Sequence, residues 1–97
     1  MATPDESAPA VWWVYVLLCH REKLYVGIAK DVEARFEMHC SRRGAFFTRL
    51  NKPIRVLARE RHSSQSAALK AEHALKRQGK EEKLAWVQRA NALGRAG

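Results

Sequence analysis

Two short apolar runs near the start of the chain restrict its fold more than any other feature. Trp12–Cys19 is rich in β-branched and aromatic residues, and Leu24–Ala29 is a second apolar run. Such runs are typical of strands, and the few polar residues between them predict a β-hairpin. The intervening residues contain neither Asn-Gly nor Asp-Gly, so the sequence leaves the type of turn open.

The register of this hairpin decides whether its two tyrosines, Tyr15 and Tyr25, lie on one face of the sheet. Side chains alternate along a strand, so an even turn that pairs His20 with Lys23 sends the tyrosines to opposite faces. An odd turn that pairs His20 with Leu24 places them on the same face. A site shared by both tyrosines therefore requires a three-residue loop or a bulge.

A helix is predicted after the hairpin. Asp31 is a good N-cap, and the helix is expected to run to about Arg43, with Gly44 ending it. Its apolar stripe recurs every four residues, at Val32, Phe36 and Cys40. Residues 45–53 are predicted to form a loop whose first three residues, Ala45, Phe46 and Phe47, are able to form a helical turn.

A third strand and two further helices complete the predicted fold. Residues 54–61 alternate apolar Ile54, Val56 and Ala58 with Arg55, Leu57 and Arg59. Ser63 or Ser64 caps a helix that reaches about Gln78, where Gly79 ends it, and 80–93 form the last helix. The side chains expected inside are Ala68, Ala71, Leu75, Leu84, Trp86 and Val87.

The fold class that follows is α+β, with a small three-stranded antiparallel sheet flanked by helices in the order β-β-α-β-α-α. Residues 1–10 are small and polar and contain two prolines, which predicts a disordered tail. Residues 11–93 are predicted to form a single domain, in keeping with a length of 97 residues.

Positive charge is concentrated in the middle of the chain. The net charge is +8, from 18 basic and 10 acidic residues. Residues 42–80 hold 11 basic and 2 acidic side chains, a net +9, whereas 1–41 carry a net −2 and 81–97 a net +1. A charge excess of this kind favours a polyanionic partner such as nucleic acid.

Several other classes of protein are excluded by pattern. The longest apolar run, Val11–Cys19, has 9 residues, well short of the ~20 that span a bilayer, and no secretory signal is recognisable. Two cysteines, Cys19 and Cys40, do not make a disulfide framework, so we expect a cytoplasmic protein with reduced thiols. The pairs Cys19-His20 and His39-Cys40 lack the spacing of structural zinc sites.

Three side chains beyond the hairpin are candidates for chemistry on residue type and position. Arg35 and His39 share a helical face that is suited to a phosphate, although the same face also suits ordinary solvent exposure. Glu72 is one of two acids in the +9 segment. It is equally compatible with a ligand of a hard cation such as Mg²⁺ and with an ion pair to Lys76 at i+4.

These residues, in this order, resemble the GIY-YIG nuclease superfamily, in particular its small stand-alone bacterial branch. Trp13-Val14-Tyr15 corresponds to the first motif and Tyr25-Val26-Gly27 to the second, with the tyrosines ten residues apart. Arg35 follows the second tyrosine by ten residues, and His39 follows Arg35 by four. The segment AALKAEHALKR places Glu72 at the family's metal-binding glutamate. The match covers about residues 12–87.

The resemblance implies a Mg²⁺-dependent endonuclease that hydrolyses DNA phosphodiester bonds with one metal ion, for which Mn²⁺ is a substitute. Glu72 would hold the metal, Arg35 would stabilise charge on the phosphate, and Tyr25 would accept a proton from water or orient it. The base role requires nearby cations to depress the pKa of Tyr25. Tyr15 and His39 would assist. The residues expected to contact the nucleic acid backbone are Lys30, Arg42, Arg43, Arg49, Lys52 and Lys76.

Two other functions remain open at this point. Trp13 stands where the family has glycine, and Ile28 stands where several relatives have a polar residue, so a catalytically weak or inactive nucleic-acid-binding module is the alternative. A protein-interaction domain that uses exposed aromatics at Trp12, Phe46 and Phe47 is the third.

Overall fold

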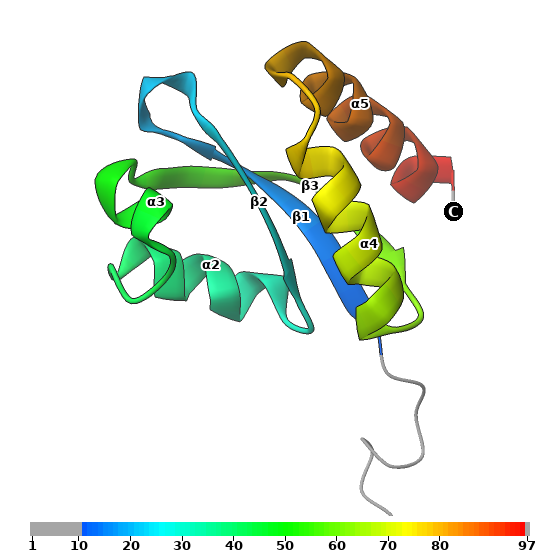
Figure 1. The fold of residues 1–97 in the computed structure, drawn as a ribbon, viewed down its shortest axis with the longest axis horizontal. Helices are drawn as coiled ribbons and strands as arrows, with labels where there is room; N and C mark the ends of the chain where they lie inside the picture. Colours follow the sequence, from blue (N-terminus) through cyan, green and yellow to red (C-terminus); the bar gives the residue numbers. More distant parts are fainter. Residues whose placement is uncertain (1–10, 97) are drawn as a thin grey trace, which may run out of the picture.

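The three predicted strands form one antiparallel sheet, and helices pack on both of its faces (Figure 1). A computed structural model describes residues 11–96, so the predicted tail at 1–10 lies outside the described residues. In chain order the elements are β1 (Trp12–Cys19), η1 (His20–Glu22), β2 (Leu24–Ala29), α2 (Val32–Cys40), α3 (Phe46–Leu50), β3 (Pro53–His62), α4 (Gln65–Lys76) and α5 (Lys80–Ala96). The predicted class is confirmed, with α3 as an added short helix.

The central strand is β1, and the order across the sheet is β2-β1-β3. Tyr15 lies opposite Gly27, and Leu17 lies opposite Tyr25. Because 15 and 17 share a face, Tyr15 and Tyr25 also share a face. The register therefore meets the condition that the sequence set for a site shared by both tyrosines.

The loop between β1 and β2 has three residues, as a shared tyrosine face requires. The amide of Cys19 donates to the carbonyl of Lys23 at 2.8 Å, so Cys19 and Lys23 close the loop. This register has the same parity as the odd pairing of His20 with Leu24, one of the two that the sequence left open, but the partner of Leu24 lies two positions earlier in the chain. Arg21 and Glu22 have φ of 62° and 58°, the left-handed conformation that lets three residues reverse the chain.

A bulge in β3 overturns the predicted alternation of that strand. Val16 pairs with Ala58 but Leu17 pairs with Val56, so Leu57 is an extra residue on β3. The bulge places Val56 and Ala58 on opposite faces of the sheet, and Ile54 is exposed. Sequence alternation continues through a bulge even though the register shifts, so the pattern alone predicted the wrong face.

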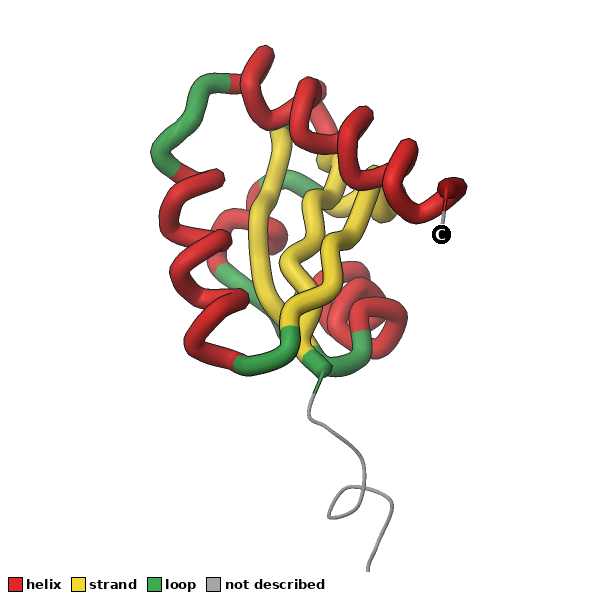
Figure 2. The backbone as a smooth tube through the Cα atoms, turned by 90° about the vertical axis from the view of Figure 1, so that its right-hand side faces the viewer, coloured by secondary structure: helices red, strands yellow, loops and turns green. Residues whose placement is uncertain are grey.

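The two faces of the sheet have different covers, visible on either side of the strands in Figure 2. On the α4/α5 face the core consists of Val14, Val16, Val26 and Ala58 packed against Ala68, Leu75, Val87 and Ala90. On the α2/α3 face it consists of Tyr15, Leu17, Cys19, Ala29 and Val32, with Phe36 and Phe47 packed on them. In the described part of the chain, no helix combines the length and the apolar character needed to cross a membrane.

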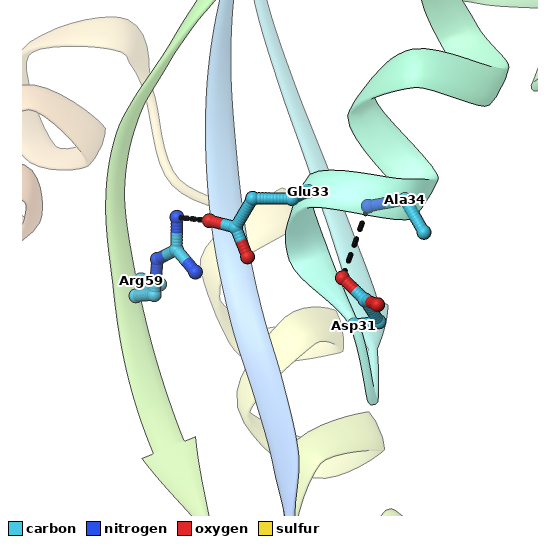
Figure 3. A network of polar contacts seen from close by, with 4 residues as sticks. All are labelled: Asp31, Glu33, Ala34 and Arg59. Atoms are coloured by element: carbon cyan, nitrogen blue, oxygen red, sulfur yellow. Dashed lines mark hydrogen bonds and ion pairs between the residues drawn. The ribbon is translucent and has the colours of Figure 1, made fainter.

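The start of α2 agrees with the prediction, and its end does not. The side chain of Asp31 accepts a hydrogen bond from the amide of Ala34 at 3.0 Å (Figure 3). The helix ends at Cys40, earlier than the expected Arg43, because Arg42 adopts a φ of 65° and the Arg43 amide bonds back to the Met38 carbonyl at 3.0 Å. The residue in the left-handed conformation that ends α2 is therefore Arg42, rather than Gly44.

An ion pair between Glu33 and Arg59 connects α2 to β3 (Figure 3). Arg59 also lies over the ring of Trp13, 5.9 Å from the ring centroid. Trp13, the residue that replaces glycine in the first motif, therefore packs between the sheet and this ion pair.

The last two helices begin as their caps predict. Ser64 caps α4 by accepting from the amide of Ala67 at 3.1 Å, and α4 ends at Lys76 rather than Gln78. Gly79 does not end α4. Its amide donates to the side chain of Glu82 at 2.6 Å, which makes Gly79 the N-cap of α5.

The buried side of α5 was predicted only in part. Val87 and Ala90 are buried and Trp86 is half-buried, whereas Leu84, expected inside, is exposed. The helix extends beyond the expected end at Leu93, to Ala96. The side-chain amide of Asn91 donates to the carbonyl of Leu57 at 3.1 Å and ties α5 to the bulge of β3.

Candidate active site

One pocket of about 410 Å³ brings together the five residues predicted to be catalytic. Its lining includes Tyr15, Tyr25, Arg35, His39 and Glu72, together with Gly27, Ile28, Arg43, Gly44 and Ala45. The five come from four elements, since β1 and β2 each supply a tyrosine, α2 supplies two side chains and α4 supplies the glutamate. Their roles stay predictions, but their convergence is a property of the fold.

A second, larger pocket of about 500 Å³ lies at the edge of β3, beside the bulge. It is lined by Trp13, Val56, Leu57, Ala58, Arg59, Ala90 and Asn91. Arg59 is the one ionisable side chain in that lining, which contains no carboxylate and no imidazole. The chemistry therefore belongs to the smaller pocket, where acid, base and cation occur together.

Gly27 explains how residues on different sides of the sheet reach one pocket. A Cβ atom at position 27 would lie 2.5 Å from the hydroxyl oxygen of Tyr15, so any larger residue would displace that ring. Because β2 is an edge strand and position 27 carries no side chain, Tyr15 extends across β2. Its hydroxyl thus lies in the pocket that Glu72 lines from α4. The glycine marks a close approach inside a strand.

A buried chain of polar groups runs away from the Tyr15 hydroxyl. This oxygen lies 3.0 Å from Nε2 of His39, and Nδ1 of His39 lies 2.8 Å from Oγ1 of Thr48. Thr48 in turn donates to the carbonyl of Ala45 at 2.8 Å. The three side chains are 1%, 2% and 1% exposed, in chain order. Gly44 packs on the imidazole, since a Cβ there would lie 2.1 Å from Nδ1.

Thr48 is the member of this buried polar chain that the sequence did not predict. It lies in a segment expected to be mainly a loop, so no helical or strand spacing related it to His39. A tertiary contact between α2 and α3 brings the two together.

Aromatic packing fixes the second tyrosine. The ring of Tyr25 meets His39 edge-on, with 4.9 Å between centroids, and lies 5.9 Å from the ring of Phe47. Phe47 and Trp12 are both partly buried against the core clusters, and Phe46 is exposed. Two of the three aromatics of the protein-interaction hypothesis therefore pack within the domain, which leaves Phe46 as the exposed one of the three.

Burial keeps the tyrosines and the histidine of the pocket neutral. It raises the pKa of Tyr15 well above the usual range, with a further contribution from Tyr25. The pKa of Tyr25 is also raised, first by burial and then by Glu72, against the lowering effect of Arg35. Burial and Arg35 lower the pKa of His39. The protein alone therefore does not provide the lowered pKa that a base role for Tyr25 requires.

Glu72 is the one carboxylate in the pocket lining, and it is 8% exposed. Its Oε2 lies 3.4 Å from Nζ of Lys76, so the ion pair that the sequence allowed is formed while the carboxylate lines the pocket. Mg²⁺ commonly uses one or two carboxylates, with water and phosphate filling the remaining positions. A single buried carboxylate beside two tyrosine hydroxyls fits that donor set. Within residues 11–96 no three His, Cys, Asp or Glu side chains converge as a metal cluster.

The predicted nucleic-acid contacts divide into groups. Arg43 lines the pocket with Arg35. Arg42, Arg49, Lys52 and His20 line an adjoining pocket of about 390 Å³ that also contacts His39. Lys76 pairs with Glu72, and Lys30 lies over the ring of Trp12, 5.4 Å from its centroid.

Neither cysteine lines the pocket of the five candidate residues, although Cys40 lines the adjoining one. Cys19 is buried, and burial raises the pKa of its thiol to about 11. Cys40 is partly buried on α2. Cys19, whose thiol stays protonated at neutral pH, is therefore a packing residue rather than a nucleophile.

Residues 11–85 match the family model described as the GIY-YIG catalytic domain. The chain belongs to the GIY-YIG family. The matched segment contains all five residues of the candidate site, and it confirms the resemblance on which the site was predicted. Trp13 is not among the residues that line the GIY-YIG pocket, whereas Ile28 is part of the lining.

Relatives of this GIY-YIG chain share both its sequence and its size. A UPF0213 protein of Xanthomonas campestris is 42% identical over 90% of this chain and 85% of its own length. A UPF0213 protein of Cupriavidus necator is 45% identical over 82% of this chain and 87% of its own. The solution NMR structure of a UPF0213 protein from Bacillus halodurans is 31% identical, has a TM-score of 0.52 and covers 80% of this chain and 83% of its own.

Proposed function

We propose that this GIY-YIG domain is a Mg²⁺-dependent endonuclease that hydrolyses phosphodiester bonds in DNA. The observation that carries the proposal is the convergence of Tyr15, Tyr25, Arg35, His39 and Glu72 on one pocket. Family membership supports a nuclease-type activity. The metal, the preference for DNA and the endonucleolytic mode are parts of the proposal.

The protein groups have separable roles in this reaction. Glu72 would hold the metal ion, which when bound supplies positive charge to polarise the scissile phosphate. Arg35 is exposed beside the pocket and its guanidinium is suited to hydrogen-bond two phosphate oxygens at once. Tyr25, kept neutral by its raised pKa, orients the attacking water by hydrogen bonding. Burial of the tyrosine rings excludes bulk water around the reacting groups.

The cations around the pocket would hold the rest of the substrate. Arg43 lies in the pocket itself, and Arg42, Arg49 and Lys52 line the adjoining one. Lys30 and Lys76 would add contacts to the backbone after exchanging their present partners. Contacts of this kind bind phosphates without reading bases, so we expect affinity to fall steeply as salt is raised.

A cleavage assay with matched variants tests the proposal. End-labelled DNA is incubated with Mg²⁺ and the wild type, Glu72→Gln or Arg35→Ala, with Glu81→Gln and Arg89→Ala as controls on the exposed side of α5. Removing a group that stabilises transition-state charge costs about 10²–10³-fold in rate, so the two pocket variants should lose at least that much. The controls should cut at the wild-type rate. Equal cutting by all five proteins would point to a contaminating nuclease and would refute the proposal.

The second candidate is a nucleic-acid-binding module without turnover. It is favoured by the ion pair of Lys76 with Glu72, which occupies the carboxylate that the metal needs, and by the raised pKa of both tyrosines. It predicts salt-sensitive binding that Glu72→Gln leaves intact, with no cleavage by any variant. Metal-dependent cleavage that disappears in Glu72→Gln would exclude it.

A further inference from the structure

We propose that Thr48 is a positioning residue that fixes which ring nitrogen of His39 carries the proton, and that it thereby makes the Tyr15 oxygen a hydrogen-bond acceptor in the pocket. The proposal deepens the proposed function and rests on it for its catalytic consequence. It identifies a residue outside the predicted set, and it assigns the direction of each hydrogen bond in the buried chain.

The direction begins at the backbone of α3. The Thr48 hydroxyl has one proton, and its oxygen lies 2.8 Å from the carbonyl oxygen of Ala45. A carbonyl only accepts, so the Thr48 proton is used in this bond. Oγ1 of Thr48 must therefore accept from Nδ1 of His39, which lies 2.8 Å away. If Nδ1 lacked its proton, either the contact with Ala45 or the contact with His39 would place two lone pairs against each other.

The proton on Nδ1 determines the other end of the ring. A neutral imidazole carries one proton, so Nε2 of His39 has a free lone pair and is an acceptor. The Tyr15 hydroxyl, 3.0 Å from Nε2, donates its proton to that lone pair. With its proton directed into the protein, the Tyr15 oxygen presents only lone pairs to the pocket. It can then accept a proton of a bound water.

The opposite tautomer would reverse this role. If Nε2 carried the proton it would donate to Tyr15, and the Tyr15 proton would then be free to point into the pocket. A hydroxyl that donates into the pocket would bond a phosphate oxygen rather than orient a water. Thr48 therefore decides between two functions of one tyrosine.

Burial limits the access of water to the bond between His39 and Thr48. His39 and Thr48 are 2% and 1% exposed, and Gly44 packs so closely on the ring that a Cβ there would overlap Nδ1. A valine at position 48 keeps the shape of threonine but offers Nδ1 no acceptor, and a buried donor without a partner is unfavourable. In this variant the proton should move to Nε2, which then donates a hydrogen bond to the Tyr15 oxygen.

The tautomer is directly measurable on the full chain. Long-range ¹H–¹⁵N NMR of protein with labelled histidines distinguishes a protonated Nδ1 from a protonated Nε2. Spectra are recorded at about pH 8, where unperturbed histidines are neutral. A His39→Gln variant assigns the His39 signals. We expect a protonated Nδ1 in the wild type and in Thr48→Ser, and a shift of the proton to Nε2 in Thr48→Val.

Cleavage rates test the catalytic consequence separately. We expect Thr48→Val to lower kcat at least tenfold with little change in KM, and Thr48→Ser to restore most of the rate. A wild-type spectrum with the proton on Nε2 overturns the role of Thr48 whatever the variants do, even if Thr48→Val fails to fold. A folded Thr48→Val with the wild-type kcat also overturns it. Absence of cleavage by the wild type contradicts instead the nuclease function, and a protonated Nδ1 then still supports the hydrogen-bond assignment.

Discussion

The two faces of the sheet are built from the same three strands but differ in what they bury. On the α4/α5 face the buried residues are all aliphatic, and Val14, Val16 and Val26 meet Ala68, Leu75 and Val87. The α2/α3 face buries Tyr15 with His39 and Thr48, so its packing includes a continuous polar chain. The α4/α5 face stabilises the fold by excluding water. The α2/α3 face also buries polar side chains, and their hydrogen bonds restrict where each proton lies.

This difference shows what each kind of burial contributes. Aliphatic contacts are non-directional and tolerate small shifts, so the α4/α5 face stabilises the sheet without determining chemistry. Hydrogen bonds in a buried site are directional, and each is costly to leave unmade. In the described residues no buried side-chain nitrogen or oxygen lacks a partner, which shows that the polar chain is complete.

The largest expected effect on stability comes from the α4/α5 face. Leu75→Ala removes a side chain that is 3% exposed and should lower the free energy of unfolding by about 2–5 kcal/mol. Leu69→Ala on the same helix, at a site 36% exposed, should cost less than about 1 kcal/mol. Urea unfolding of both variants measures the difference. Equal losses at the two sites would mean that this face is not the packed core described here.

A change on the α2/α3 face should affect activity more than stability. Gly27→Ala adds a Cβ within 2.5 Å of the Tyr15 hydroxyl, which forces the ring away from His39. We expect a loss of stability of about 1–3 kcal/mol and at least a tenfold lower cleavage rate in folded protein. Gly79→Ala is the matched control, because its Cβ would meet only the flexible side chain of Glu82. Wild-type activity in Gly27→Ala would show that cleavage does not depend on the position of the Tyr15 ring.

The smallest expected effect is the contribution of His39 to the pH dependence of stability. Its pKa in the folded protein is lowered from 6.5 by burial and by Arg35, so below about pH 6.5 the unfolded chain binds more protons. The contribution of His39 to stability is complete above that pH and is lost as pH falls toward the folded pKa. Thermal unfolding at about pH 7.5 and 5.5 should show a smaller acid-induced loss in His39→Gln than in the wild type.

His73→Gln, at an exposed histidine on α4, provides the comparison for this pH effect. It should retain the acid-induced loss of the wild type, since all other titrating groups are unchanged. Identical pH dependence in the wild type, His39→Gln and His73→Gln would show that burial of the imidazole is not linked to folding.

Much of the fold was predictable because it depends on local pattern. Apolar runs predicted all three strands, and Asp31 and Ser64 were recognisable as caps because capping involves residues only three apart. The bulge at Leu57 and the helix stop at Arg42 were predicted wrongly. Both depend on backbone conformations that the usual turn residues do not mark at those positions.

The sequence by itself determined the family, the positive charge of the middle segment and the identity of the five candidate residues, because spacing along the chain and residue type suffice for these. Only the tertiary structure decided that Tyr15 and Tyr25 share a face, that Glu72 joins them in one pocket and that Thr48 holds His39. The physical reason is that a strand register, a bare Gly27 and a hydrogen bond between α2 and α3 are relations across the fold. Each fixes the direction of a side chain, and a one-residue shift in register or a single added Cβ would change that direction without altering any local pattern.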